Sequence, residues 1–167
     1  MRTGVARSGA LSKEELEKHK VYPEQERLRR GPVAIIECIQ EIPCDPCVYS
    51  CPQNAISLET LSALPKLDSE KCIGCALCVP SCPGLAIFIV DLTYSKEEAL
   101  VHLPHEFLPV PKVGEAVDAV DREGRLRAQG KVLKVRADPK TDRTTVLTIA
   151  VPKHLALEVR GIRRRSR

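Results

Sequence analysis

Eight cysteines, all between positions 38 and 82, are the residues of this 167-residue chain whose type and spacing could do chemistry. The last four follow the pattern C-x2-C-x2-C-x3-C-P, which runs from Cys72 to Pro83. Three closely spaced thiolates and a fourth before a proline are the spacing that holds a 4Fe-4S cluster. The spacing therefore predicts a site for the transfer of single electrons.

The first four cysteines repeat this pattern at a fixed offset of 31 residues. The matched pairs are Cys44 and Cys75, Cys47 and Cys78, Cys51 and Cys82, and Pro52 and Pro83. One position breaks the register, because Glu41 stands 31 residues before Cys72 and the nearest spare thiol is Cys38. We expect Cys38 to be the ligand, since a carboxylate is a harder donor than a thiolate. Glu41 as the ligand, or a cluster that lacks one iron, are the alternatives.

Two other uses of an even cysteine count are possible in principle. A disulfide framework belongs mainly to secreted proteins, and the N-terminus has no apolar signal segment. Four-cysteine zinc sites also use C-x2-C pairs, but they do not require three cysteines followed by x3-C-P. Paired 4Fe-4S clusters in a reducing cytoplasm are therefore the favoured interpretation.

Composition limits the remaining classes of function. Aromatic residues make up 3% of the chain, so it offers few platforms on which nucleic-acid bases could stack, and the net charge of +4 is weak support for such a partner. No apolar stretch is long enough to span a membrane. We expect neither nucleic-acid binding nor a membrane span.

The chain divides into four parts of different composition. Residues 1–31 form a basic extension, in which the capping box Ser12–Glu15 predicts a short helix to about His19. Residues 32–93 form the cysteine module, bracketed by strands in "GPVAIIE" and "LAIFIVDLTY". Within it, Cys51 and Cys82 are expected to open helical turns, with Pro52 and Pro83 near the first positions. The extension is either an arm that lies on a partner or a solvated segment.

Residues 98–163 alternate between short apolar runs and turn residues, as small β barrels and sandwiches do. The turns are "REG" and "DPKTD", and five runs between them read as strands. No catalytic constellation is present, so we expect this segment to dock on other subunits. His102 and His105 fall on opposite faces of a strand and are expected to be structural. The basic end, with residues 164–167 as its tail, is either solvated or docked in an acidic groove.

The cysteine module resembles the bacterial two-cluster ferredoxins over residues 33–90, and the expected fold class is α+β: a dicluster ferredoxin-like module followed by a small all-β segment. In these ferredoxins the fourth cysteine of each run serves the other cluster. The resemblance therefore assigns one cluster to Cys38, Cys44, Cys47 and Cys82. It assigns the other to Cys72, Cys75, Cys78 and Cys51.

The runs "ECIQEIPCDPC" and "KCIGCALCVPSCPGLAIFIVD", with the C-terminal β segment, also resemble the ferredoxin-like subunits of flavin-dependent amine and amino acid dehydrogenases of the proline, hydroxyproline and sarcosine type. This resemblance implies two [4Fe-4S] clusters that relay electrons within a hetero-oligomer. It places FAD, with a [2Fe-2S] centre as a further option, on flavoprotein partner subunits. The chain itself would have no catalytic residues. A free-standing ferredoxin carrier and a redox-sensing or structural iron–sulfur module are the alternatives.

Overall fold

The computed structural model of the chain describes residues 4–137 and 144–164. Its strands are β1 (Val33–Ile36), β2 (Ile56–Ser57), β3 (Lys66–Leu67), β4 (Ile87–Asp91), β5 (Glu98–His105), β6 (Ala116–Val120), β7 (Leu126–Arg136), β8 (Thr145–Pro152) and β9 (Gly161–Arg164). Its helices are α1 (Val5–Ser8), α2 (Lys13–Lys18), α3 (Gln25–Leu28), α4 (Pro46–Tyr49), α5 (Cys78–Ser81) and the 3-10 turn η1 (Lys153–Leu155).

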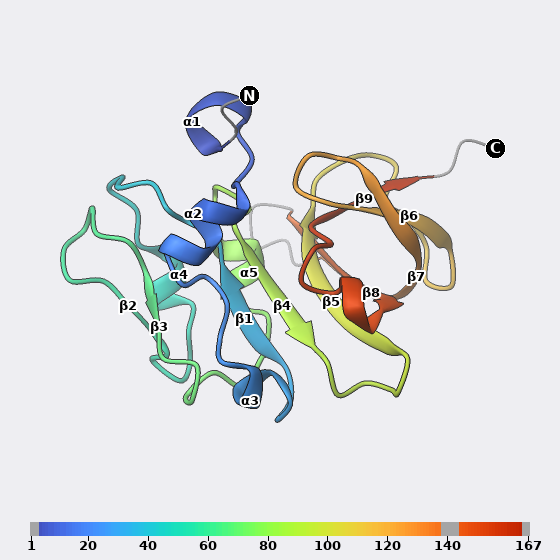
Figure 1. The fold of residues 1–167 in the computed structure, drawn as a ribbon, viewed down its shortest axis with the longest axis horizontal. Coiled ribbons are helices and arrows are strands. Elements are labelled where there is room, and N and C mark those ends of the chain that lie inside the picture. Colours follow the sequence, from blue (N-terminus) through green and yellow to red (C-terminus); the bar gives the residue numbers. More distant parts are fainter. Residues whose placement is uncertain (1–3, 138–143, 165–167) are drawn as a thin grey trace.

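One antiparallel sheet of seven strands, in the order β1-β4-β5-β8-β7-β6-β9, runs through the molecule. The short β2–β3 hairpin forms a separate sheet. Figure 1 shows the helices and this hairpin around β1 and β4, with the curved strands β5 to β9 on the other side. The expected combination of helices with a β segment is confirmed at this level. The pairing of β4 with β5 makes the β segment continuous with the cysteine module.

Strands β1 and β4 are buried on both faces, because each face packs against a different core. Val33 and Ile35 of β1 lie in the larger core, which includes Leu103 and Ile149 of the C-terminal half. The alternate residues of β1 lie in a second core that contains the cysteines. Since side chains alternate across a strand, this pair of strands connects the cysteine site to the body of the chain.

The N-terminal extension packs on the chain's own core. The predicted capping box is confirmed, with Ser12 at the start of α2. The Ser12 side chain accepts from the backbone N–H of Glu15, and the Glu15 side chain accepts from the backbone N–H of Ser12. Leu16 and Leu28 are buried in the larger core. The interpretation as a wholly solvated extension was therefore wrong, because apolar side chains in these short helices bury against the sheet.

The five runs predicted in the C-terminal half correspond to strands β5 to β9. The turn "REG" follows β6 as predicted, whereas all of "DPKTD" and residues 165–167 lie outside the described residues. The basic run at the end does not begin as a solvated tail. Arg160 is 8% exposed, and residues 161–164 form β9 along the edge of β6.

The two histidines of β5 lie on opposite faces of the strand, as predicted. His105 is buried on the core side, and His102 is half-buried on the other side, where its Nδ1 lies 3.0 Å from Thr148 Oγ1. Burial lowers the pKa of His102 to about 4, and the positive charge of Arg136 lowers it further in the same direction. His102 is therefore neutral in the folded chain at neutral pH.

We expect this histidine to make the stability of the fold depend on pH. The unfolded chain takes up the proton near pH 6.5 and the folded chain only near pH 4, so the folded state loses stability as the pH falls between these values. The loss should be about 2 kcal/mol between pH 7 and pH 5. Urea unfolding of the wild type and of His102→Gln at both pH values measures it. The exposed His154→Gln is the control, and equal pH dependence in all three proteins would contradict the prediction.

Candidate metal centres

The structure gathers the eight cysteines into two sets of four, each lining its own hollow. One hollow is lined by Cys51, Cys72, Cys75 and Cys78. The other is lined by Cys38, Cys44, Cys47 and Cys82. The hollows are similar in size, and their remaining walls are mostly apolar. Each set combines three thiols of one run with the fourth thiol of the other run.

The loop that carries Cys72, Cys75 and Cys78 depends on a glycine. Gly74 has a φ of +67°, and a Cβ atom there would lie 2.4 Å from the Cβ of Pro32. Ala76 is also left-handed, with a φ of +61°. The backbone N–H of Ala34 in β1 donates to the Cys72 sulfur at 3.4 Å. The loop thus turns tightly against β1, and an unusual backbone aims its thiols into the hollow.

The widened first loop brings Cys38 into its set and leaves Glu41 outside. Cys38 lies two residues after β1 and lines the same hollow as Cys44, whereas Glu41 is exposed to solvent and is not among the residues around it. Gln40 and Ile42, which flank Glu41 in the widened loop, do line the hollow. Strand β1 therefore fixes the position of Cys38, and within the widened loop the Glu41 side chain lies in solvent while its two neighbours face the hollow.

The fourth cysteine of each run is held by the same backbone turn. The N–H of Ala55 donates to the Cys51 sulfur at 3.2 Å, and that of Ala86 donates to the Cys82 sulfur at 3.4 Å. In both runs the residue before the alanine is left-handed, with a φ of 49° at Asn54 and 52° at Leu85. This backbone conformation points the next N–H back at the sulfur in both runs.

The prolines after these cysteines do not begin helices. Cys51 and Cys82 come after the ends of α4 and α5, and Pro52 and Pro83 lie in the turns that follow. The sequence prediction was wrong because the helical turn precedes the fourth cysteine. Pro46 occupies the first position of α4 instead.

Burial and mutual repulsion raise the pKa values of the Cys47 and Cys78 thiols. Burial raises the pKa of Cys47 to about 11, and the neighbouring Cys82, Cys44 and Cys38 raise it further. Burial raises the pKa of Cys78 to about 12, with added effects of Cys72, Cys75 and Cys51. The thiols that influence one another are those that share a hollow. Because ligation requires thiolates, cluster binding must release protons.

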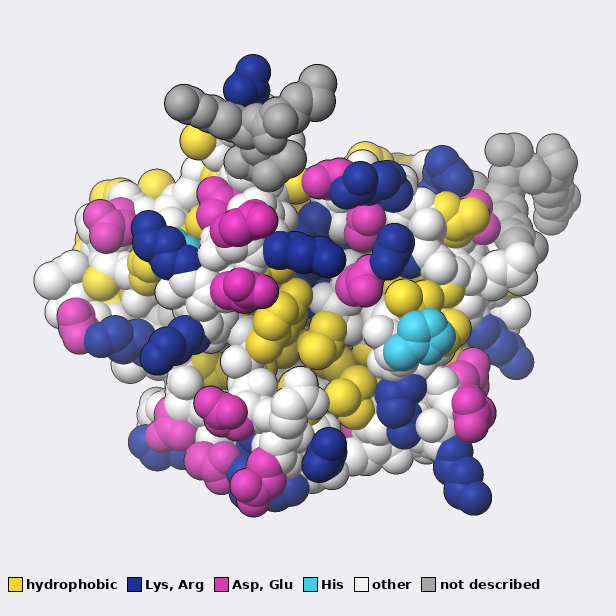
Figure 2. Space-filling view, viewed as in Figure 1, with side chains coloured by type: hydrophobic (Ala, Val, Ile, Leu, Met, Phe, Trp, Pro, Cys, Tyr) yellow, Lys and Arg dark blue, Asp and Glu magenta, His cyan; other side chains and the backbone are white. Residues whose placement is uncertain are grey.

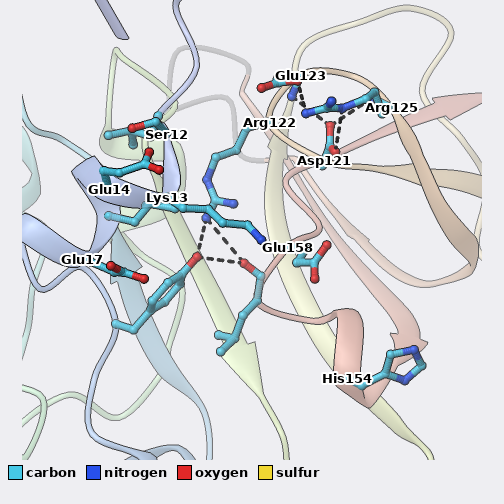
Figure 3. Close-up of a pocket in the computed structure, with 14 residues that line it drawn as sticks. Ser12, Lys13, Glu14, Glu17, Asp121, Arg122, Glu123, Arg125, His154 and Glu158 are labelled. Atoms are coloured by element: carbon cyan, nitrogen blue, oxygen red, sulfur yellow. Dashed lines mark hydrogen bonds and ion pairs between the residues drawn. The ribbon is translucent and has the colours of Figure 1, made fainter. Parts of the chain in front are cut away.

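Glu37, the residue before Cys38, lies at the centre of a buried ion cluster. Its carboxylate accepts hydrogen bonds from Arg122 Nε at 2.8 Å and from Arg160 Nε at 2.6 Å. Arg122, labelled in Figure 3, also donates from Nη2 to the Tyr22 hydroxyl at 2.8 Å. Arg160 lies over the Phe88 ring, 4.8 Å from its centroid. The cluster therefore joins the N-terminal extension, the cysteine module and the β segment beside one set of thiols.

A surface groove of about 560 Å³ lies between α2 and the β segment. Figure 2 shows apolar side chains gathered there, flanked by charged ones. Its apolar lining includes Leu11, Leu16 and Leu157, and Arg122 forms part of its wall, but none of the residues that line it is a cysteine. The groove is therefore separate from the candidate metal centres.

The ion cluster was missed in the sequence because Glu37 lies 85 positions from Arg122 and 123 from Arg160. No spacing rule connects them. A glutamate directly before the first cysteine was the one local signal, and it is not distinctive by itself.

The described residues hold no group of three His, Cys, Asp or Glu side chains arranged to bind a single metal ion. No described helix is long and apolar enough to cross a membrane. The four sulfur donors of each hollow, the apolar walls and the N–H groups directed at sulfur suit four-thiolate iron–sulfur ligation.

Comparison with known proteins agrees with this chemistry. Residues 37–86 match the model of the 4Fe-4S dicluster domain. The polyferredoxin-like subunit of an aliphatic sulfonate oxidoreductase from Pyrococcus furiosus is 35% identical over 72 residues, which cover 38% of this chain and 39% of that protein. An uncharacterized ferredoxin from Methanocaldococcus jannaschii is 39% identical over 67 residues, covering 39% of this chain and 41% of its own length.

Protein Pixie of Drosophila melanogaster is 32% identical over 92 residues, 47% of this chain and 15% of that protein. The matched segment thus spans less than half the length of each of these curated relatives. No solved structure matches the chain. The match to the family model lies within the cysteine module.

Proposed function

We propose that this chain, a dicluster ferredoxin through its residues 37–86, is the electron-transfer subunit of a multisubunit flavin-dependent dehydrogenase. The iron–sulfur electron-transfer role follows from the domain and from a relative that is itself named as a subunit of an oxidoreductase. The flavoprotein partners are inferred from the resemblance of the cysteine runs and the C-terminal β segment to the ferredoxin-like subunits of such enzymes.

The observation that carries the proposal is the division of the eight thiols between two hollows, each with a fourth thiol from the other run. We assign Cys38, Cys44, Cys47 and Cys82 to the first [4Fe-4S] cluster. We assign Cys51, Cys72, Cys75 and Cys78 to the second. When bound, such clusters accept and pass on single electrons at potentials that depend on their surroundings.

The chain's own residues hold and insulate these centres. The N–H groups of Ala34, Ala55 and Ala86 stabilise negative charge on three of the sulfurs. Val79 and Ile87 are fully buried beside the thiols and keep water from the hollows. FAD, with a [2Fe-2S] centre as a further option, is assigned to partner subunits in the cytoplasm, and the substrate chemistry takes place there.

Anaerobic purification of the complete protein from its native host tests both parts of the proposal. We expect about eight iron and about eight acid-labile sulfide per chain, the content of two [4Fe-4S] clusters. We also expect co-purification with a subunit that contains flavin. Zinc without sulfide would overturn the cofactor assignment. Full iron content without any partner chain would favour a free ferredoxin carrier instead.

A further inference from the structure

The dicluster domain depends on arginines that it does not itself contain. Residues 37–86 hold two lysines and six acidic residues but no arginine, so their formal charge is −4, whereas the whole chain carries +4. Arginines from the N-terminal extension and from the β segment reach the cysteine loops. The segments outside the domain thus supply the positive charge beside the thiols.

Arg136, the last residue of β7, contacts the loop of the second set. Its Nη1 donates to the carbonyl of Cys75 at 3.4 Å, and its Nη2 donates to the carbonyl of Ala76. Both carbonyls belong to the loop that contains the left-handed residues Gly74 and Ala76. The guanidinium therefore stabilises an unusual backbone and places a full positive charge against the loop. Among the described contacts of Arg136, none is an ion pair with a carboxylate.

Arg27, in α3, holds the other end of the same loop. It is 7% exposed and donates to the carbonyl of Cys72 at 2.6 Å. Its remaining bonds go to the carbonyls of Gly31, Pro32 and Ser69. Glu70 interacts with Arg27 electrostatically, but it forms its ion pair with Arg30 at the surface. Arg27 is thus a buried cation that is satisfied by carbonyl dipoles alone.

The first set of thiols has a different electrostatic neighbourhood. There the two guanidinium groups of Arg122 and Arg160 share the carboxylate of Glu37, which offsets part of their charge. At the second set the positive charges of Arg27 and Arg136 have no hydrogen-bonded carboxylate to offset them in the described structure. Uncompensated charge acts strongly at such sites because partly buried surroundings screen it less than water does.

We propose, on the basis of the function proposed above, that Arg27 and Arg136 are positioning residues that raise the reduction potential of the cluster held by Cys51, Cys72, Cys75 and Cys78. Reduction adds one negative charge to the centre, and a nearby cation stabilises the reduced form more than the oxidised form. The β segment and the N-terminal extension therefore take part in electron transfer as well as in docking.

Redox titration of the purified iron-loaded chain, followed by electron paramagnetic resonance, tests this proposal on Arg136→Gln. The midpoint reduction potential of one of the two centres should fall by about 59 mV, which corresponds to a tenfold change in the equilibrium constant of a one-electron reduction. Arg136→Lys keeps the charge, so its midpoint should stay near the wild-type value. The affected signal is assigned by comparison with Cys75→Ser, which removes a ligand of the same centre.

Arg127→Gln is the matched control, because Arg127 lies on the same strand but pairs with Glu158 at the surface. An unchanged midpoint in Arg136→Gln, or an equal fall in Arg136→Gln and Arg136→Lys, would overturn the proposal. If Arg136→Gln did not retain iron, Arg136→Lys still decides, since a fall beyond that of Arg127→Gln would show that charge is not the cause. The wild-type iron and sulfide content tests the proposed function separately.

Discussion

Replacing Glu37 by alanine is expected to lower the free energy of unfolding by about 3–5 kcal/mol, because it leaves a buried charge without its partner. The side chain of Arg160 is 3% exposed, and its Nε donates to Glu37. Its Nη1 is already bonded to the carbonyls of Ala156 and Val159, and its Nη2 has no partner in the described structure. No other described carboxylate pairs with it. Chemical unfolding of the iron-loaded protein measures the loss.

Two further variants separate this effect from a general loss of charge. Glu59→Ala removes an exposed carboxylate paired with Lys66, and should cost less than about 1 kcal/mol. The double variant Glu37→Leu, Arg160→Met removes the buried pair together, and should be less destabilised than Glu37→Ala. If Glu37→Ala behaved like Glu59→Ala, the ion cluster would not be a stabilising connection between the β segment and the cysteine module.

Replacing Cys38 by serine is expected to remove or damage the first cluster and leave the second intact. A hydroxyl is a poor substitute for a soft thiolate at iron, so the centre that also uses Cys44, Cys47 and Cys82 loses a ligand. Iron content should fall toward about half of the wild-type value, since one of two 4Fe-4S centres is affected. Iron counting and low-temperature electron paramagnetic resonance of the reduced protein measure both centres.

Glu41→Gln is the matched comparison, because Glu41 occupies the position that the internal repeat assigns to the ligand. Its side chain is exposed and lies outside the residues that line the hollow, so both clusters should survive the substitution. Two intact centres in Cys38→Ser together with the loss of one in Glu41→Gln would reverse the assignment.

Much of the site was predictable from local sequence, because short-range spacing sets how a loop can surround a centre. The 31-residue repeat predicted the two runs of thiols, and the capping box predicted α2. The alternating runs after residue 98 predicted strands β5 to β9, since a strand buried on one face repeats its pattern every two residues. These features depend on residues a few positions apart.

The tertiary structure decided the features that depend on distant residues. Strand β1 delivers Cys38 to the first hollow, and no repeat could show this because the register is broken at Glu41. The pairing of β4 with β5 makes one sheet of two expected segments. Arg136 and Arg160 lie at least 60 positions from the residues of the cysteine module that they contact. No repeating pattern in the sequence indicates which distant residue such an arginine will contact. The sequence alone determined which thiols are available as ligands, whereas long-range packing determined how they are grouped and which charges surround them.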